Sequence, residues 1–156
     1  MNVLLLTIVL SFLPISELRG SIPYAVYNGT PWFVAYPLCA ALNALVAPAC
    51  WLFLGTVHKL FLKMEWYQRF FERFIGKARS KLANGVERWG WFGVSLFVAI
   101  PLPLTGAWTG TLGAWVLGLS KRKTMMAVVV GVLISGAVVT AIVVFGVQAL
   151  QIFLKK

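Results

Sequence analysis

Two long apolar segments that carry no charge place the strongest constraint on how this chain can fold. Residues 32–56 and 124–154 contain no Asp, Glu, Lys or Arg over 25 and 31 positions. As helices, both are long enough to cross a hydrocarbon core of about 30 Å, the second with a tilt or a projecting end. In the whole chain, 60% of residues are hydrophobic and 12% are charged. This composition is typical of integral membrane proteins, so we expect a membrane protein with two spanning helices.

Local signals refine both expected spans. Thr30 and Pro31 suit the N-cap and first helical position of a helix over 32–56, and Pro37 and Pro48 predict kinks within it. The last helix carries small residues at four-residue spacing, with two more alongside, which would let another helix approach closely. These residues are Ala127, Gly131, Ser135, Gly136 and Thr140.

The two remaining apolar blocks, 2–29 and 92–118, are interrupted near their middles. Short apolar arms on either side of a Pro/Gly break are typical of re-entrant hairpins, which enter a membrane and leave on the same side. One kinked spanning helix per block is the alternative. The breaks fall at Pro14, Gly20 and Pro23 in the first block and at "PLPLTG", residues 101–106, in the second.

The distribution of positive charge favours hairpins. Eight of the fourteen Lys and Arg residues lie between His58 and Trp91, which predicts that this linker is cytoplasmic. A hairpin over 92–118 returns the "KRK" cluster at 121–123 to the cytoplasm, whereas a spanning helix would place it outside. Both termini are then expected outside, in the plasma membrane, although this puts Lys155 and Lys156 on the less favoured side.

The resulting prediction is an all-α membrane fold built as an inverted repeat of two units, each a re-entrant hairpin followed by one transmembrane helix. With only two full spans, the chain has little protein to enclose a polar path, so a homodimer is expected. The predicted segments are hairpin 1–31, helix 32–56, linker 57–91, hairpin 92–118 and helix 119–156, within one membrane domain.

The linker 57–91 shows the pattern of a basic amphipathic helix. Its apolar residues recur at three- and four-residue steps while Lys and Arg occupy other faces. We expect it to lie in the cytoplasmic interface against anionic lipid headgroups. Nucleic-acid binding is not expected, because the basic residues lie between apolar blocks rather than on a soluble face.

Few residues in this chain could support enzymatic chemistry. The sequence has no Asp, one His and no GxSxG motif, and three of its four glutamates lie in the linker. We therefore expect no enzyme, no metal site and no cofactor. Cys39 and Cys50 are eleven residues apart, about 16 Å along one helix, so they are expected to be buried and unbridged. The apolar start, residues 1–13, resembles a signal peptide but lacks its basic flank and cleavage site, so we expect it to remain part of the fold.

Glu17 and Arg19 are the only charged residues in either expected hairpin. A charge near the bilayer centre costs about 3 kcal/mol, so such residues face protein or water and are functional candidates. Two structural alternatives stay open: a mutual salt bridge that pins the loop, or a hairpin shallow enough for both charges to reach water.

The half-helices that follow the breaks suggest a ligand. Ser21 and Thr105 are plausible N-caps for helices that would start near the middle of the membrane from opposite sides. Their free N–H groups and positive dipole ends, with Arg19, would form an anion site. Glu17 could balance Arg19 when the site is empty, or carry a proton when it is filled.

Two blocks of sequence resemble a known family. "ISELRGSIPYA" at 15–25 and "FVAIPLPLTGAWTGTLGAWVLGLSKRK" at 97–123 closely resemble the signature blocks of the small multi-drug export protein family, a relative of the DedA-like (VTT-domain) membrane proteins. The resemblance implies paired re-entrant hairpins and transport. DedA-like relatives are linked to the movement of polyprenyl-phosphate or phospholipid, coupled to protons or sodium. Their second hairpin tip carries arginines, which "LPLTGAWTG" lacks, so an arginine clamp there is not implied.

The leading hypothesis is a transporter that moves an amphiphile with an anionic headgroup past a midplane site between the hairpins, with Glu17 as the proton-coupling residue. One alternative is export of small lipophilic cations in exchange for protons at Glu17, with Trp108 and Tyr24 offering aromatic faces. Another is a membrane scaffold protein that transports nothing. The candidate substrate-binding residues are Glu17, Arg19, Gly20, Ser21, Pro101, Pro103, Thr105, Gly106, Ala107 and Trp108.

Overall fold

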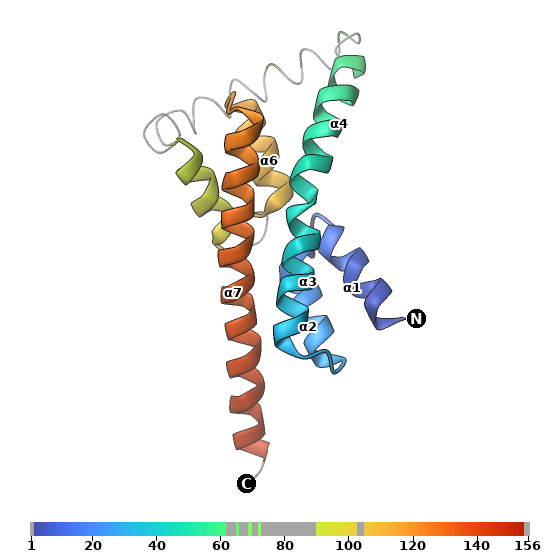
Figure 1. Ribbon diagram of the computed structural model, residues 1–156, viewed down its shortest axis with the longest axis vertical. Coiled ribbons are helices and arrows are strands. Elements are labelled where there is room, and N and C mark those ends of the chain that lie inside the picture. The colour runs from blue at the N-terminus through green and yellow to red at the C-terminus, as the bar shows by residue number, and fades with distance from the viewer. Residues whose placement is uncertain are drawn as a thin grey trace.

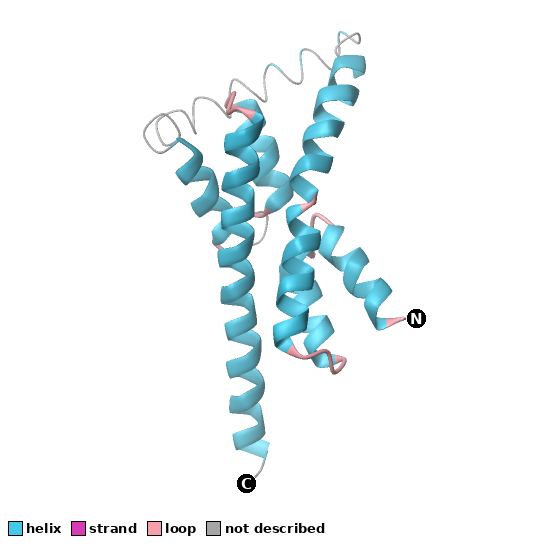
Figure 2. Ribbon diagram, viewed as in Figure 1, coloured by secondary structure: helices cyan, strands magenta, loops and turns pink. Residues whose placement is uncertain are grey.

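The computed structural model describes residues 2–61, 90–102 and 105–154, together with Glu65, Arg69 and Glu72. In this part of the chain every regular element is a helix (Figure 2), which confirms the all-α class predicted from the sequence. Six labelled helices and one further helix without a label, Gly90–Ala99, lie along these residues. The others are α1 (Val3–Phe12), α2 (Glu17–Tyr27), α3 (Trp32–Ala44), α4 (Val46–Phe61), α6 (Ala107–Val116) and α7 (Lys121–Leu154).

Two segments in the described part are long and apolar enough to cross a membrane. One, Trp32–Thr56, is formed by α3 and the first part of α4 and has a mean hydropathy of 1.9. The other, Lys121–Gly146, belongs to α7 and has a mean hydropathy of 2.8. The 34 residues of α7 correspond to about 51 Å of helix, so one end must project beyond a hydrocarbon core of ordinary thickness.

The expected kinks in the first long segment are only partly seen. Pro37 lies inside α3, which continues past it to Ala44. The helix is interrupted at Leu45, because Pro48 in the first turn of α4 has no N–H to donate to the carbonyl four residues earlier. The N-cap prediction was wrong by one residue: α3 begins at Trp32 with Pro31 in the cap position and no side-chain cap. Pro31 already has an extended backbone, so Thr30 lies outside the helix.

The four short helices of the described part form two hairpins that point toward each other (Figure 1). α1 and α2 turn near the middle of the molecule and open toward the lower end of the view, while helix Gly90–Ala99 and α6 turn at the same level and open toward the upper end. The second break lies where the sequence placed it, between Ala99 and Ala107. The first is shorter than expected and comprises residues 13–16, around Pro14.

Gly20 and Pro23 therefore do not break the first hairpin, contrary to the sequence-based prediction. Both lie inside α2, which begins at Glu17. The predicted N-cap, Ser21, is also inside this helix, where its hydroxyl donates to the Glu17 carbonyl oxygen at 2.8 Å. Gly20 is placed against the Ser16 side chain of the preceding turn, so a larger residue would collide there.

The hairpins pack between the two long segments. α2 contacts α3 and α7, and α6 contacts α4 and α7, so each hairpin touches both long segments. The small residues of α7 make these approaches possible, as predicted. Gly131 faces helix Gly90–Ala99, where a Cβ would lie 2.8 Å from the Ser95 carbonyl oxygen, and Gly136 faces the ring of Tyr36 in α3. The other small residues of the set, Ala127, Ser135 and Thr140, are buried.

The interior between the hairpins and the long segments is apolar with a few polar links. Asn43 is buried near the α3–α4 interruption, and its Nδ2 donates to the Ser11 carbonyl oxygen at 2.9 Å, which ties α3 to α1. The Asn43 Oδ1 atom has no hydrogen-bond partner within the described part of the protein. Cys39 and Cys50 are buried and free, as the sequence predicted.

Most of the linker, and with it the predicted basic amphipathic helix, lies outside the described residues, as do Lys155 and Lys156. Within the linker, Glu65 and Arg69 are exposed and form an ion pair at 3.3 Å. The "KRK" residues at 121–123 are exposed at the start of α7, at the same end of the molecule as the C-terminal end of α4 (Figure 1). This common end is consistent with one basic side of a membrane.

Candidate functional site at the contact of the two hairpins

The carboxylate of Glu17 caps helix α6 of the other hairpin. Its Oε2 accepts from the Ala107 N–H at 3.3 Å and its Oε1 accepts from the Trp108 N–H at 3.4 Å. The N-cap position of α6 is Gly106, which has no side chain to accept these bonds. An anion is stabilised at a helix N-terminus by the free N–H groups and by the helix dipole. An acid 90 residues earlier in the sequence therefore supplies a cap that the local sequence lacks.

Gly106 is required for this contact because the carboxylate occupies the space of a side chain. A Cβ built on Gly106 would collide with Glu17 Oε2 and would lie 2.6 Å from Oε1. The obstacle is steric, since the backbone of Gly106 is extended, with a φ of 169° that any residue adopts. Glu17 is 6% exposed and Gly106 is buried, so a Cβ at Gly106 could be accommodated only if the carboxylate left the start of α6.

The guanidinium of Arg19 holds the residue just before this cap. Its Nη2 donates to the Thr105 carbonyl oxygen and, at 3.1 Å, to the Thr105 hydroxyl oxygen. Thr105 is not the N-cap of α6, contrary to the prediction. Its hydroxyl is bonded within the break instead, where it donates to the carbonyl oxygens of Ile100 and Leu102 and accepts from the Leu102 N–H. Thr105 thus folds the tip of the second hairpin into a shape that presents its carbonyl to Arg19.

A third contact joins the tips at the other side of α6. The indole Nε1 of Trp108 donates to the Phe12 carbonyl oxygen at 2.8 Å. Phe12 is the last residue of α1, where carbonyl groups lack helical partners, so the bond satisfies a helix end that would otherwise be unpaired. Each hairpin therefore supplies polar partners for the other.

Glu17 itself has a backbone conformation that is costly for a residue with a side chain. Its φ is +45°, in the left-handed region, which costs about 1 to 2 kcal/mol for an L-amino acid. Such conformations persist where surrounding contacts fix them, and they are frequent at functional sites. Here the contacts with Ala107 and Trp108 hold the strained residue at the start of α2.

The structure brings together most of the predicted site residues and places two others inside α2. Glu17, Arg19, Thr105, Ala107 and Trp108 meet through the bonds described above, Gly106 lies against the Glu17 carboxylate, and Pro101 lies in the same break, half-buried. The backbone N–H groups of Gly20 and Ser21 are not available to an anion, because both residues lie inside α2; the Gly20 N–H donates to the Ser16 carbonyl oxygen at 3.1 Å. The remaining candidate, Pro103, lies outside the described residues.

A salt bridge between Glu17 and Arg19 is not present. Among the described residues the structure records an ion pair only between Glu65 and Arg69. Glu17 and Arg19 instead bind successive parts of the second tip, one the N–H groups of α6 and the other the carbonyl before them. In the described part of the chain no group of three or more His, Cys, Asp or Glu residues could hold a metal ion.

The cap by Glu17 is the part of the site that the sequence did not reveal. A useful signal was present, because Gly106 leaves the start of α6 without a local side-chain acceptor, and Glu17 is the only acid in either hairpin. The role of Phe12 as an acceptor had no signal, because any residue at the end of α1 offers a carbonyl.

Together these features define an all-helical membrane protein in which two opposed hairpins meet at a buried polar contact. The chain belongs to the small multi-drug export family: the family model described as "Putative small multi-drug export protein" matches residues 17–138. The match begins at Glu17, the first residue of α2, and includes the second hairpin tip and about half of α7. No curated protein and no solved structure matches the chain.

Proposed function

We propose that the protein is an exporter built as an inverted repeat, in which both hairpins are re-entrant and meet at the middle of the membrane. The first unit comprises α1, α2 and the long segment of α3 and α4; the second comprises helix Gly90–Ala99, α6 and α7. Two observations support this arrangement. The hairpins open toward opposite ends (Figure 1), and the contact of α2 with α7 has its counterpart in the contact of α6 with α4. Opposed units of this kind suit alternating access.

This topology predicts that the two ends of α7 lie on opposite sides of the membrane. In variants with one added cysteine, Lys121→Cys and Lys156→Cys, an impermeant maleimide added to intact cells should label only the second. The wild type serves as a low-background control, because Cys39 and Cys50 are buried. Labelling of both variants from the same side would contradict the proposed topology.

The substrate class follows from what Glu17 does at the start of α6. An acidic headgroup offers the same kind of oxygen acceptor as the Glu17 carboxylate, so it can replace Glu17 at the Ala107 and Trp108 N–H groups. Arg19 lies beside this position, and only its Nη2 is engaged by the described residues, so further donors remain for an anion. The observation that carries the proposal is the cap itself, an anion-binding helix end filled by a carboxylate of the protein.

Replacement of the Glu17 carboxylate by the substrate headgroup would couple substrate binding to protonation of Glu17. The headgroup can occupy the helix end only when Glu17 has left it, and a protonated Glu17 is a weaker acceptor for the two N–H groups. Binding of an anionic substrate and protonation of Glu17 therefore favour each other. The proposed cycle moves an amphiphile with an anionic headgroup while Glu17 carries the coupling proton.

Transport in proteoliposomes tests this function. With a fluorescent alkyl phosphate as the probe, Glu17→Gln and Arg19→Ala should each slow translocation by about tenfold to a hundredfold, because each removes charge-assisted hydrogen bonds of about 1.5–3 kcal/mol. Glu72→Gln is the matched control, since Glu72 is exposed in the linker and should transport at the wild-type rate. Folding of each variant is checked by its elution profile in detergent.

A second probe decides between anion transport and the alternative functions. The family description names multi-drug export, so a lipophilic cation such as ethidium belongs in the same assay. Cation export that is lost in Glu17→Gln and kept in Arg19→Ala would replace the anion proposal with proton-coupled drug export. If neither probe moves in wild-type vesicles while both variants lose folded protein, the two residues are structural and the protein is a scaffold.

A further inference from the structure

The position of the Glu17 carboxylate shows which chemical group the start of α6 is shaped to hold. Its two oxygens bind separate donors, Oε2 the Ala107 N–H and Oε1 the Trp108 N–H. A Cβ built on Gly106 would lie 2.5 Å from the carboxyl carbon Cδ and 2.6 Å from Oε1, and closer still to Oε2. The whole carboxyl group, and not one oxygen alone, therefore takes the space of the absent side chain.

The protein encloses this carboxyl group closely. Glu17 is 6% exposed, Leu18 next to it in α2 is 3% exposed, and Ala107 is fully buried. Protein interiors are packed to the density of organic crystals, so few gaps remain beside a buried group. A carboxylate is planar, with a single carbon behind its two oxygens. A phosphate or sulfonate head is tetrahedral, so its further substituent would have to enter space that surrounding atoms occupy.

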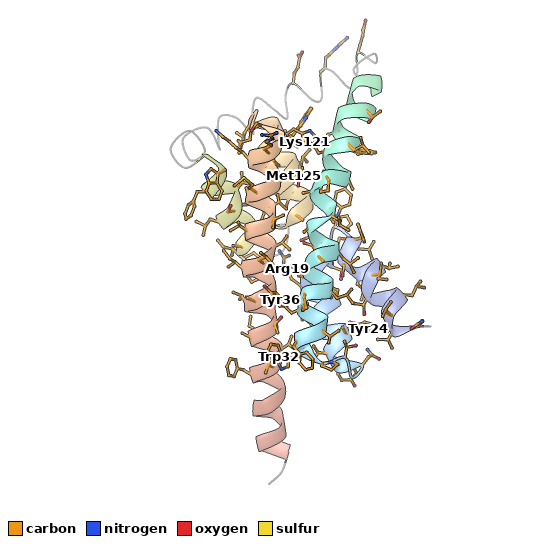
Figure 3. All side chains as sticks on the ribbon, in the orientation of Figure 1. Arg19, Tyr24, Trp32, Tyr36, Lys121 and Met125 are labelled. Carbon is orange, nitrogen blue, oxygen red and sulfur yellow. The ribbon has the colours of Figure 1, made fainter. Side chains whose placement is uncertain are left out.

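The charges at the hairpin tips also suit a head with one negative charge. Arg19 is the only Lys or Arg within residues 1–31 and 92–118. Figure 3 shows it near the middle of the molecule, whereas Lys121 lies toward the upper end. A carboxylate that replaces the Glu17 carboxylate leaves the net charge of the site unchanged once Glu17 is protonated. A monoalkyl phosphate carries a charge of about −1.5 to −2 at pH 7, so it would add buried charge without a partner, which is costly.

We propose that the start of α6 is a carboxylate site, and that the head of the transported amphiphile is a carboxylate, bound in preference to a phosphate or sulfonate. The inference rests on the proposed function for the replacement of Glu17 by a substrate and adds the chemical class of the head. A substrate carboxylate takes over the Ala107 and Trp108 N–H groups in the geometry that Glu17 uses. Arg19, half-buried beside the site, supplies the positive charge.

Chemical rescue tests the selectivity of the site. Glu17→Ala removes Cγ, Cδ and both oxygens, which correspond to the heavy atoms of one acetate ion. The full-length variant in detergent should melt below the wild type, because α6 loses its cap. Added acetate should raise its melting temperature by about 2–4 °C, whereas phosphate at the same ionic strength should not. The control is Glu72→Ala, since Glu72 is exposed in the linker and acetate should leave that variant unchanged.

A second measurement uses the wild-type protein. Amphiphiles with the same tail and different heads are added in a non-ionic detergent, and binding is followed as a rise in melting temperature. Dodecanoate should bind at least about tenfold more tightly than dodecyl phosphate, because it matches the site in shape and charge. Dodecanol measures the contribution of the tail alone, and dodecyltrimethylammonium should bind no better than dodecanol.

The outcomes separate this inference from the proposed function. Rescue by phosphate as strong as rescue by acetate would overturn the carboxylate site and leave an anion exporter standing. Rescue by acetate alone, with no transport of any probe in wild-type vesicles, would support the carboxylate site and reject the exporter. If Glu17→Ala does not fold, the comparison of heads on the wild type decides, and dodecyl phosphate that binds as tightly as dodecanoate would overturn the proposal. Absence of rescue by either anion in a folded variant would overturn it as well.

Discussion

Gly106→Ala should abolish transport and lower the thermal stability of the protein in detergent, although it adds a single methyl group. The new Cβ would occupy the position of the Glu17 carboxylate and force it away from the two backbone N–H groups that hold it. Expulsion of the carboxylate leaves a buried acid without donors and the start of α6 without a cap. Loss of the partners of a buried charge costs about 3–5 kcal/mol, which exceeds the typical cost of a point mutation.

Gly113→Ala is the control for this prediction. Gly113 lies in the same helix, and a Cβ there meets nothing within 4 Å, so the substitution should leave stability unchanged or raise it slightly. A second comparison isolates the collision: the double variant Glu17→Ala with Gly106→Ala removes the carboxylate that the methyl group meets. It should be no less stable than Gly106→Ala alone, a non-additive result that marks direct contact. Equal melting temperatures for Gly106→Ala and wild type would show that Glu17 does not cap α6.

Gly131→Ala should detach the second hairpin from α7 and destabilise the protein by about 1 to 3 kcal/mol, the range found for overpacked interiors. The Cβ would lie 2.8 Å from the Ser95 carbonyl oxygen and 2.8 Å from Val98 Cγ1. The obstacle includes backbone, so a change of side-chain rotamer cannot relieve it. Because the tip of this hairpin carries Thr105 and the start of α6, transport should fall together with stability. Thermal unfolding in detergent, followed by circular dichroism, measures the first effect.

Gly146→Ala provides the matched control in the same helix. A Cβ at Gly146 meets nothing within 4 Å, so this variant should melt at the wild-type temperature or slightly above it. A loss of stability equal to that of Gly131→Ala would indicate that glycines in α7 matter for helix flexibility rather than for close packing. Wild-type stability of Gly131→Ala would argue against the close approach of helix Gly90–Ala99 to α7.

The elements of this fold that depend on local composition could be predicted from the sequence. The two long uncharged segments and the small residues of α7 are explicit in the sequence, and the break at 100–106 follows from its prolines and glycine. The first hairpin was harder, because Gly20 and Pro23 are helix breakers by intrinsic preference. Both nevertheless lie inside α2, where Gly20 packs on Ser16 and the first residue, Glu17, is held by α6.

The residues of the charged site were predicted from the sequence, but the contacts between them were not. Glu17 and Arg19 stood out because charges are rare in apolar hairpins, and the start of α6 stood out because it follows a proline-rich break. The partners of Glu17 and Arg19 could not be deduced from the sequence, because they lie 86 to 91 residues further along the chain and meet these side chains only in the tertiary fold. The sequence suggested an empty anion site balanced by a salt bridge, whereas the protein fills the helix end with its own carboxylate.

The separation of Glu17 from its partners also has a consequence for biosynthesis. The N-terminal hairpin leaves the ribosome first, while the N–H groups of Ala107 and Trp108 and the carbonyl of Thr105 are about ninety residues away. In the proposed re-entrant arrangement, insertion of Glu17 and Arg19 to the middle of a bilayer at that stage costs about 3 kcal/mol for each charge. We therefore expect the first hairpin to have no stable membrane position of its own until the second hairpin has been synthesised. The proposed arrangement thus predicts assembly in a late, cooperative step rather than helix by helix.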